Sequence, residues 1–220
     1  MVSHLLGPLL VCLALVAGCG RAERGGASGG PKVMVGPAEV DEETAKNISH
    51  TPFTLTDQDG KAFSSAELAG KVWLGSIFFA NCPGPCFREN QAVAEIVREI
   101  ADPDFVAVSL TCDPDNDTTD VLARYAARFE ADAARWKFLT GDMRTIRRVG
   151  QDTMGLTTEV GVHSERGVVF DRQGRLRGGY HLLQPETVAR LKRLIREVLA
   201  EPAAAAPPAA ALPAASETTP

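Results

Sequence analysis

The sequence predicts an α/β protein in which a central mixed sheet is flanked by helices and preceded by an N-terminal β-hairpin. Strand-length apolar runs alternate with helical patterns along most of the chain, an order typical of parallel strands joined by crossover helices. Two turn signals, Asp59-Gly60 and Asp171–Gly174, each separate a pair of short strand patterns and so predict antiparallel hairpins. With 220 residues and 45% hydrophobic content, the chain can bury one sizeable core.

Each strand is predicted by a short run of apolar or alternating residues. Residues 53–56 alternate between apolar and polar, whereas the run at 72–79 is mostly apolar, as in a strand that is covered on both faces. The strands are expected at 53–56, 62–63, 72–79, 105–110, 136–139, 168–170 and 176–180.

The helices are predicted by their caps and by apolar residues that recur on one face. Ser64 and Glu67 form a capping box, and Pro185 suits the first position of the last helix. Apolar residues between Val93 and Ile100 have one-face spacing. The helices are expected before Gly70, from the cysteines to about Ile100, from Asp117 or Thr118 to Phe129, from Asp142 to about Thr153, and from Pro185 to Val198.

The N-terminal segment predicts export and lipidation. Residues 5–17 are apolar over a length that suits a signal peptide rather than a membrane span. The run ends in Val16-Ala17-Gly18-Cys19, which resembles the bacterial lipobox, where cleavage before the cysteine leaves a residue that carries lipid. An uncleaved anchor is the alternative. Either way, we expect a membrane-anchored protein of the bacterial cell envelope, with its domain outside the cytoplasm.

Composition predicts the rest of the domain organisation. We expect a lipoprotein signal peptide at 1–18, a flexible Gly- and Ala-rich tether at 19–46, the folded domain at 47–200 and a disordered Ala/Pro-rich tail at 201–220. The formal net charge of −5 gives no reason to expect nucleic-acid binding.

Two cysteines stand between the strand at 72–79 and the helix that follows it, in Cys82-Pro83-Gly84-Pro85-Cys86. The N-terminus of a helix favours thiolate over thiol, and thiolate is the form that attacks disulfides and binds soft metals. Redox thioredoxins have two residues between their cysteines, whereas three residues place the sulfurs about one helical turn apart, a separation that a metal ion can bridge.

The predicted element order is that of a thioredoxin-like fold: strand, helix, strand, helix, then an antiparallel hairpin and a closing helix. In that fold the loop before the hairpin lies against the cysteine turn. Here that loop has no proline and offers His163 instead, an imidazole of the kind that commonly binds metals. Two thiolates and one imidazole suit copper. The alternative is a structural histidine.

These residues resemble the Sco/SenC family of copper-binding assembly factors for cytochrome c oxidase. The resemblance covers roughly residues 50–199 and includes the segments Ser109–Thr118 and His163-Ser164. Its specific part is the cysteine pair together with His163, since the strand and turn segments alone would fit many thioredoxin-like proteins. It implies Cys82, Cys86 and His163 as ligands of Cu(I) or Cu(II). The implied partner is cytochrome c oxidase subunit II, at its binuclear copper (CuA) site.

Other residues carry weaker hypotheses. Cys112 stands where family members commonly have an apolar residue; we expect it to be buried, and a disulfide with Cys82 or Cys86 and an added metal ligand are the alternatives. His181 is expected beyond the second hairpin strand and exposed. Asp113 and Asp117 read as a turn and helix cap, and by resemblance as interface candidates. The four arginines near the second hairpin read as a solvated face (Arg166, Arg172, Arg175 and Arg177).

Two classes of function therefore stay open. In the first, the protein is a metallochaperone that binds copper through two thiolates and one histidine. In the second, it is an exported thiol–disulfide oxidoreductase that keeps partner cysteines reduced, with Cys82 attacking and Cys86 resolving. The three-residue spacer and His163 favour copper.

Overall fold

The computed structural model describes residues 52–202. The predicted signal peptide, Cys19, the tether and most of the predicted tail lie outside the described residues. Within the described residues, no helix is long and apolar enough to span a bilayer.

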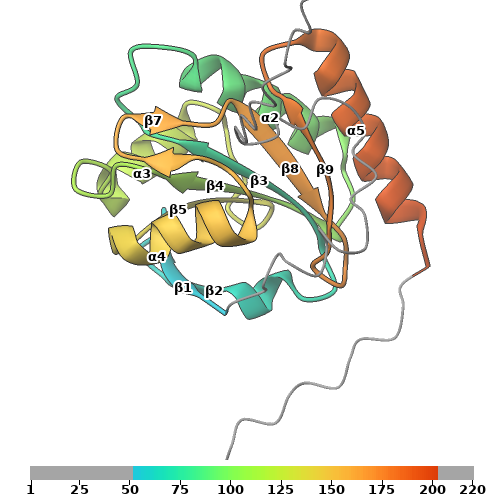
Figure 1. Ribbon diagram of the computed structural model, residues 1–220, viewed down its shortest axis with the longest axis horizontal. Coiled ribbons are helices and arrows are strands. Elements are labelled where there is room, and N and C mark those ends of the chain that lie inside the picture. The colour runs from blue at the N-terminus through green and yellow to red at the C-terminus, as the bar shows by residue number, and fades with distance from the viewer. Residues whose placement is uncertain (1–51, 203–220) are drawn as a thin grey trace, which may run out of the picture. The chain divides into compact units, whose positions relative to one another are not determined.

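Seven strands form one mixed sheet, in the order β2-β1-β5-β4-β3-β8-β9 (Figure 1). The central strand β3 pairs in parallel with β4 and antiparallel with β8, and β1 joins β5 antiparallel. This arrangement confirms the predicted fold class, including the N-terminal hairpin. The strands of the sheet are β1 (Thr54–Asp57), β2 (Ala62–Ser64), β3 (Val72–Phe78), β4 (Phe105–Thr111), β5 (Trp136–Thr140), β8 (Arg166–Phe170) and β9 (Leu176–His181).

The predicted helices are present, and one differs in form. The segment expected to be helical up to Thr153 is a short α-helix followed by a π-helical turn, a form that often occurs at functional sites. The helical elements are the 3₁₀ turn η1 (Ser65–Leu68), α2 (Cys86–Glu99), α3 (Thr119–Ala127), α4 (Met143–Arg148), the π turn η2 (Val149–Thr153) and α5 (Pro185–Ala200).

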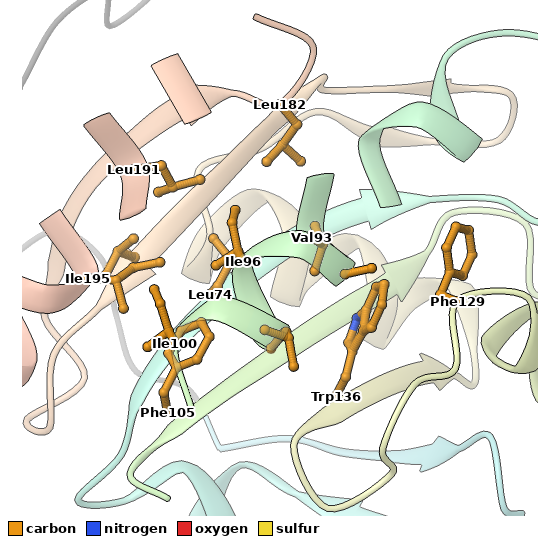
Figure 2. Packing of buried hydrophobic residues seen from close by; sticks show 14 of the residues in the cluster. Leu74, Val93, Ile96, Ile100, Phe105, Phe129, Trp136, Leu182, Leu191 and Ile195 are labelled. Carbon is orange, nitrogen blue, oxygen red and sulfur yellow. The ribbon is translucent and has the colours of Figure 1, made fainter. Parts of the chain in front are cut away.

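Both faces of β3 are covered, so every one of its residues is buried. Because successive side chains of a strand point to opposite faces, Leu74 packs with α2 and α5, whereas Trp73 packs with residues of α4 and η2. On the first face, Ile96 of α2 and Ile195 of α5 converge over the sheet (Figure 2). Because neither face of β3 meets solvent, its sequence is a mostly apolar run without an alternating polar face, and this run identified it as a buried strand.

A buried polar network crosses the first of these cores. The Ser109 hydroxyl donates to Asn90 Oδ1 at 3.3 Å, and Trp136 Nε1 donates to Ser109 Oγ at 2.9 Å. Asn90 Nδ2 donates to the Tyr125 hydroxyl at 3.2 Å, and Ser76 Oγ lies 3.0 Å from Ser109 Oγ. The network fixes how α2 and α3 sit on three strands, because each buried polar atom needs its partner.

The predicted solvated arginine face is wrong for Arg172. Its side chain is only 13% exposed, and its guanidinium donates to the carbonyls of Val198, Leu199 and Glu201. The last carbonyls of a helix lack hydrogen-bond donors within the helix, and the Arg172 guanidinium donates to those at the end of α5.

Candidate functional site

The cysteine turn begins where β3 ends at the carboxyl edge of the sheet. The Cys82 N–H donates to the Phe79 carbonyl at 3.3 Å, which closes the turn. Pro85 has helical backbone angles and its carbonyl accepts the Glu89 N–H at 3.0 Å, so α2 starts at Cys86. The strand therefore delivers the first cysteine to a loop and the second to the first turn of a helix.

The two thiols differ in exposure. Cys82 is half-buried and packs against the hydrophobic cluster in which Cys86 is fully buried. The Gly84 N–H donates to Cys82 Sγ at 3.3 Å. Both cysteines are free thiols.

The expectation that the helix terminus favours thiolate is wrong for Cys86. Burial, contact with Cys82 and the nearby Glu89 carboxyl together raise the pKa of the Cys86 thiol well above its ordinary value, although the Phe79 backbone opposes them. Burial, with a contribution from Glu165, also raises the pKa of Glu89 to about 7. Desolvation therefore outweighs the helix terminus at the inner thiol.

Asp117 braces the cysteine turn from the neighbouring loop. Its carboxylate accepts the Ala80 N–H at 3.0 Å and the Thr111 hydroxyl at 2.5 Å. The residue is 1% exposed, so it is not the interface residue that the resemblance implied, and Thr118 rather than Asp117 precedes α3. Asp113 does form the expected turn, because its carbonyl accepts the Asn116 N–H.

Asn90 supports Cys86 from within α2. Its Nδ2 donates to the Cys86 carbonyl at 3.1 Å as well as to Tyr125. Sequence reasoning missed this residue, although a polar side chain one turn after Cys86, on the face that carries Val93 and Val97, was a signal for it.

His163 lies in a small hairpin that the sequence did not predict as strand. Strands β6 (Thr158–Glu159) and β7 (Val162–His163) pair antiparallel, with Thr158 opposite His163 and Glu159 opposite Val162. The side chain of His163 lies outside the described residues. Figure 1 shows β7 near the sheet edge to which β3 runs.

The hairpin and the cysteine turn face each other across one surface groove. Gly161, Val162 and Glu165 line one side of it, and Cys82 and the residues 83–85 line the other. The structure thus brings the backbone segment that holds His163 against the cysteine turn, as predicted for this loop. Among the described side chains, no three His, Cys, Asp or Glu residues form a group that could hold a metal ion.

Cys112 is buried, as predicted. It packs with residues of α4 and η2, whereas Cys86 packs on the opposite face of the sheet. Burial raises the pKa of the Cys112 thiol to about 11, against the effect of a hydrogen bond from the Gly161 backbone. This cysteine therefore lies in a different part of the core from Cys86, apart from the thiol pair.

His181 is not beyond the hairpin strand. It is the last residue of β9, its side chain is 37% exposed, and its Nδ1 lies 3.9 Å from Glu165 Oε2. The strand extends one residue further than predicted because β9 pairs with Arg166 at that position.

A family model described as SCO1/SenC matches residues 41–196, which is most of the chain and includes both cysteines and His163. The chain belongs to the SCO1/SenC family. The resemblance stated from the sequence is thereby confirmed.

Curated relatives of this Sco family protein cover part of its length. The SCO1 protein homolog of Bacillus subtilis is 33% identical over 97 residues, which is 43% of this chain and 50% of the relative. Protein SCO2 of Saccharomyces cerevisiae mitochondria is 36% identical over 81 residues, 36% of this chain and 27% of the relative. The similarity thus spans half or less of these relatives.

Solved structures of the family share the fold. A SCO1/SenC family lipoprotein from Bacillus anthracis is 25% identical with a TM-score of 0.63, over 70% of this chain and 96% of that one. Bradyrhizobium japonicum ScoI, solved with copper bound, is 27% identical with a TM-score of 0.52, over 66% of this chain and 98% of that one. The described Sco domain is therefore similar to nearly the whole of each solved chain.

Proposed function

We propose that this protein binds copper through Cys82, Cys86 and His163 and passes it to the CuA site of cytochrome c oxidase subunit II. The observation that carries the proposal is the pair of free thiols at the cysteine turn, which faces the hairpin of His163 across one groove. Thiolates and imidazole are soft or borderline ligands that suit copper. Membership of the family, in which ScoI of Bradyrhizobium japonicum was solved with copper bound, supports the choice of metal.

The difference between the two thiols suits transfer. Copper can exchange with a partner protein only through an exposed ligand, and Cys82 is the more accessible of the two sulfurs. The buried Cys86 and its contacts with Asn90 keep the inner ligand in place while the outer one exchanges. Copper here is the transported ion, which Cys86 would retain and which would leave through Cys82.

The test is a copper titration of the purified protein with its thiols reduced and with them oxidised. We expect the reduced protein to bind one copper ion and the oxidised protein, with a Cys82–Cys86 disulfide, to bind none, because a disulfide has no thiolate to offer. Equal binding by both forms contradicts the proposal.

A thiol–disulfide reductase is the second candidate, and the exposure of Cys82 beside the buried Cys86 favours it. The Cys82 thiolate would attack a partner disulfide, and Cys86 would then resolve the mixed disulfide, so that the partner gains two electrons and this protein becomes a disulfide. Metal-free Cys86→Ser protein should then accumulate a mixed disulfide with the partner. If it forms none, the reductase is refuted and the chaperone is left.

We further propose that Cys19 carries lipid and that residues 19–46 tether the domain of residues 47–200 outside the cytoplasm. The apolar run before Cys19 and the composition of the segment after it support this placement. Such an anchor would hold the copper site near a membrane-embedded oxidase.

A further inference from the structure

The β6–β7 hairpin is too small to hold its own position. Each of its strands has two residues, and a two-stranded ladder alone is marginal in water. Two side chains of this hairpin, Val160 and Val162, are about 60% exposed, so burial of the tip contributes little. Contacts from elsewhere must therefore set where strand β7 lies.

The first contact is an ion pair at Glu159. Arg147 Nε and Nη2 donate to its two carboxylate oxygens at 3.0 and 2.7 Å, and Gln151 Nε2 donates to Oε1 at 3.1 Å. A two-pronged arginine–carboxylate pair fixes orientation as well as distance. Glu159 lies opposite Val162, so the pair ties the residue before His163 to α4 and η2.

The second contact is packing at Thr158, the residue directly opposite His163. Thr158 is fully buried, and its hydroxyl donates to the Leu156 carbonyl at 2.9 Å. Its side chain fills the space that Gly150 leaves open: a Cβ on Gly150 would lie 1.9 Å from Thr158 Oγ1. The π turn η2 thus provides a socket for the hairpin, namely the space beside Gly150 that the Thr158 side chain fills.

We propose that Arg147 and Gln151 are positioning residues that hold strand β7 against the cysteine turn, so that His163 can complete the copper site. These two residues are called the hairpin clamp below. The inference rests on the proposed copper function, because the position of His163 matters only if it binds the metal. In related metal sites, loss of an outer-shell partner costs about 10- to 100-fold in metal affinity.

The clamp is tested first without metal, by hydrogen exchange of the amides of residues 158–163 in the purified full-length protein. We expect faster exchange in Arg147→Ala and in Glu159→Ala, with no further increase in the double variant over Glu159→Ala, because Glu159→Ala already removes the ion pair with Arg147 as well as the bond from Gln151. Arg148→Ala is the matched control, since Arg148 is an exposed arginine of the same helix for which no ion pair is found within residues 52–202. Unchanged exchange in Arg147→Ala overturns the clamp whatever copper does.

The metal half of the inference is tested by copper titration of the same variants. Arg147→Ala should weaken Cu(II) binding by about 10- to 100-fold and alter its thiolate-to-copper absorption. It should weaken Cu(I) binding less, because the two thiolates can hold Cu(I) alone.

The outcomes separate the two proposals. A wild-type protein that binds no copper refutes the proposed function, and with it the positioning role. A wild-type Cu(II) spectrum in Arg147→Ala, combined with a changed spectrum in His163→Ala, overturns the positioning role alone. Faster exchange with weakened Cu(II) binding, absent from Arg148→Ala, supports the inference.

Discussion

Replacing Gly150 by alanine tests the socket in which the hairpin sits. Gly150 lies in a helical turn, where alanine is favoured over glycine by about 1 kcal/mol. The new Cβ would lie 1.9 Å from Thr158 Oγ1 and 2.7 Å from Thr158 Cβ, where real Cβ contacts stay above 3.0 Å. The threonine is buried, branched at Cβ and hydrogen-bonded to Leu156, so it cannot swing aside.

The overlap should outweigh the helix propensity. Overpacking of a filled site costs about 1–3 kcal/mol, and a contact as short as 1.9 Å belongs at the upper end of that range. After the gain of about 1 kcal/mol in helix propensity, we expect Gly150→Ala to lower the free energy of unfolding by about 2 kcal/mol. For a chain of this size each kcal/mol corresponds to a fall in Tm of about 2–4 °C.

The measurement is urea unfolding of the metal-free reduced protein. Thr158→Ala provides the matched background, because it removes the atom nearest to the new methyl group: adding Gly150→Ala to Thr158→Ala should cost less than adding it to wild type. A Gly150→Ala protein as stable as wild type, or more stable, would refute the packing of Thr158 on Gly150.

Three further predictions concern the metal, the anchor and the β1–β2 hairpin. His163→Ala should weaken Cu(II) binding strongly and Cu(I) binding less, measured by titration with each ion, because two thiolates can hold Cu(I) in near-linear geometry; unchanged affinity for both ions would return His163 to a structural role. Cys19→Ser should abolish lipid labelling and reduce copper loading of the oxidase while the protein still binds copper; wild-type protein without lipid on Cys19 would contradict the anchor. Asp57→Asn should destabilise the protein by about 2 kcal/mol at pH 7, measured by denaturation. Burial raises the pKa of Asp57, but Lys137 and two backbone N–H groups outweigh it and hold the pKa below its usual value. This stability is therefore present above the unfolded pKa of about 4 and is lost as the pH falls through the folded value, so the difference between variant and wild type should shrink in acid; a pH-independent difference would rule out the charge of Asp57 as its cause.

The sequence predicted the sheet and its helices because their signals are local. The apolar run that became β3, the capping box at Ser64 and Glu67, and Pro185 at the start of α5 all appear where the structure has them. The end of α4 was not predictable in this way, since a π turn depends on how Gly150 meets a strand that follows later in the chain.

The candidate site was predicted only in its chemically distinctive residues. Cys82 and Cys86 were recognised from their spacing and from the strand before them. The brace at Asp117 was not recognised, because its partners lie in other elements. The contact of Asn90 with Cys86 was missed although both residues lie in α2, one turn apart. The high pKa of Cys86 was missed for the same reason: the helix terminus is visible in the sequence, whereas the depth of burial is not.

The pairing of β3 with β8 sets the order in which the site can be assembled. The cysteine turn follows β3 directly, but the hairpin of His163 stands just before β8, which pairs with β3 in the register Trp73↔Phe170. Residues so far apart in sequence meet late, since closing a long loop costs entropy before its contacts form. A chain that has folded only as far as β4 has both thiols and no hairpin beside them. Copper captured by such an intermediate would be held by thiolates alone. Only after β8 has paired with β3 would His163 stand beside the thiols, so completion of the sheet is the step that would distinguish a loaded chaperone from a partly folded chain.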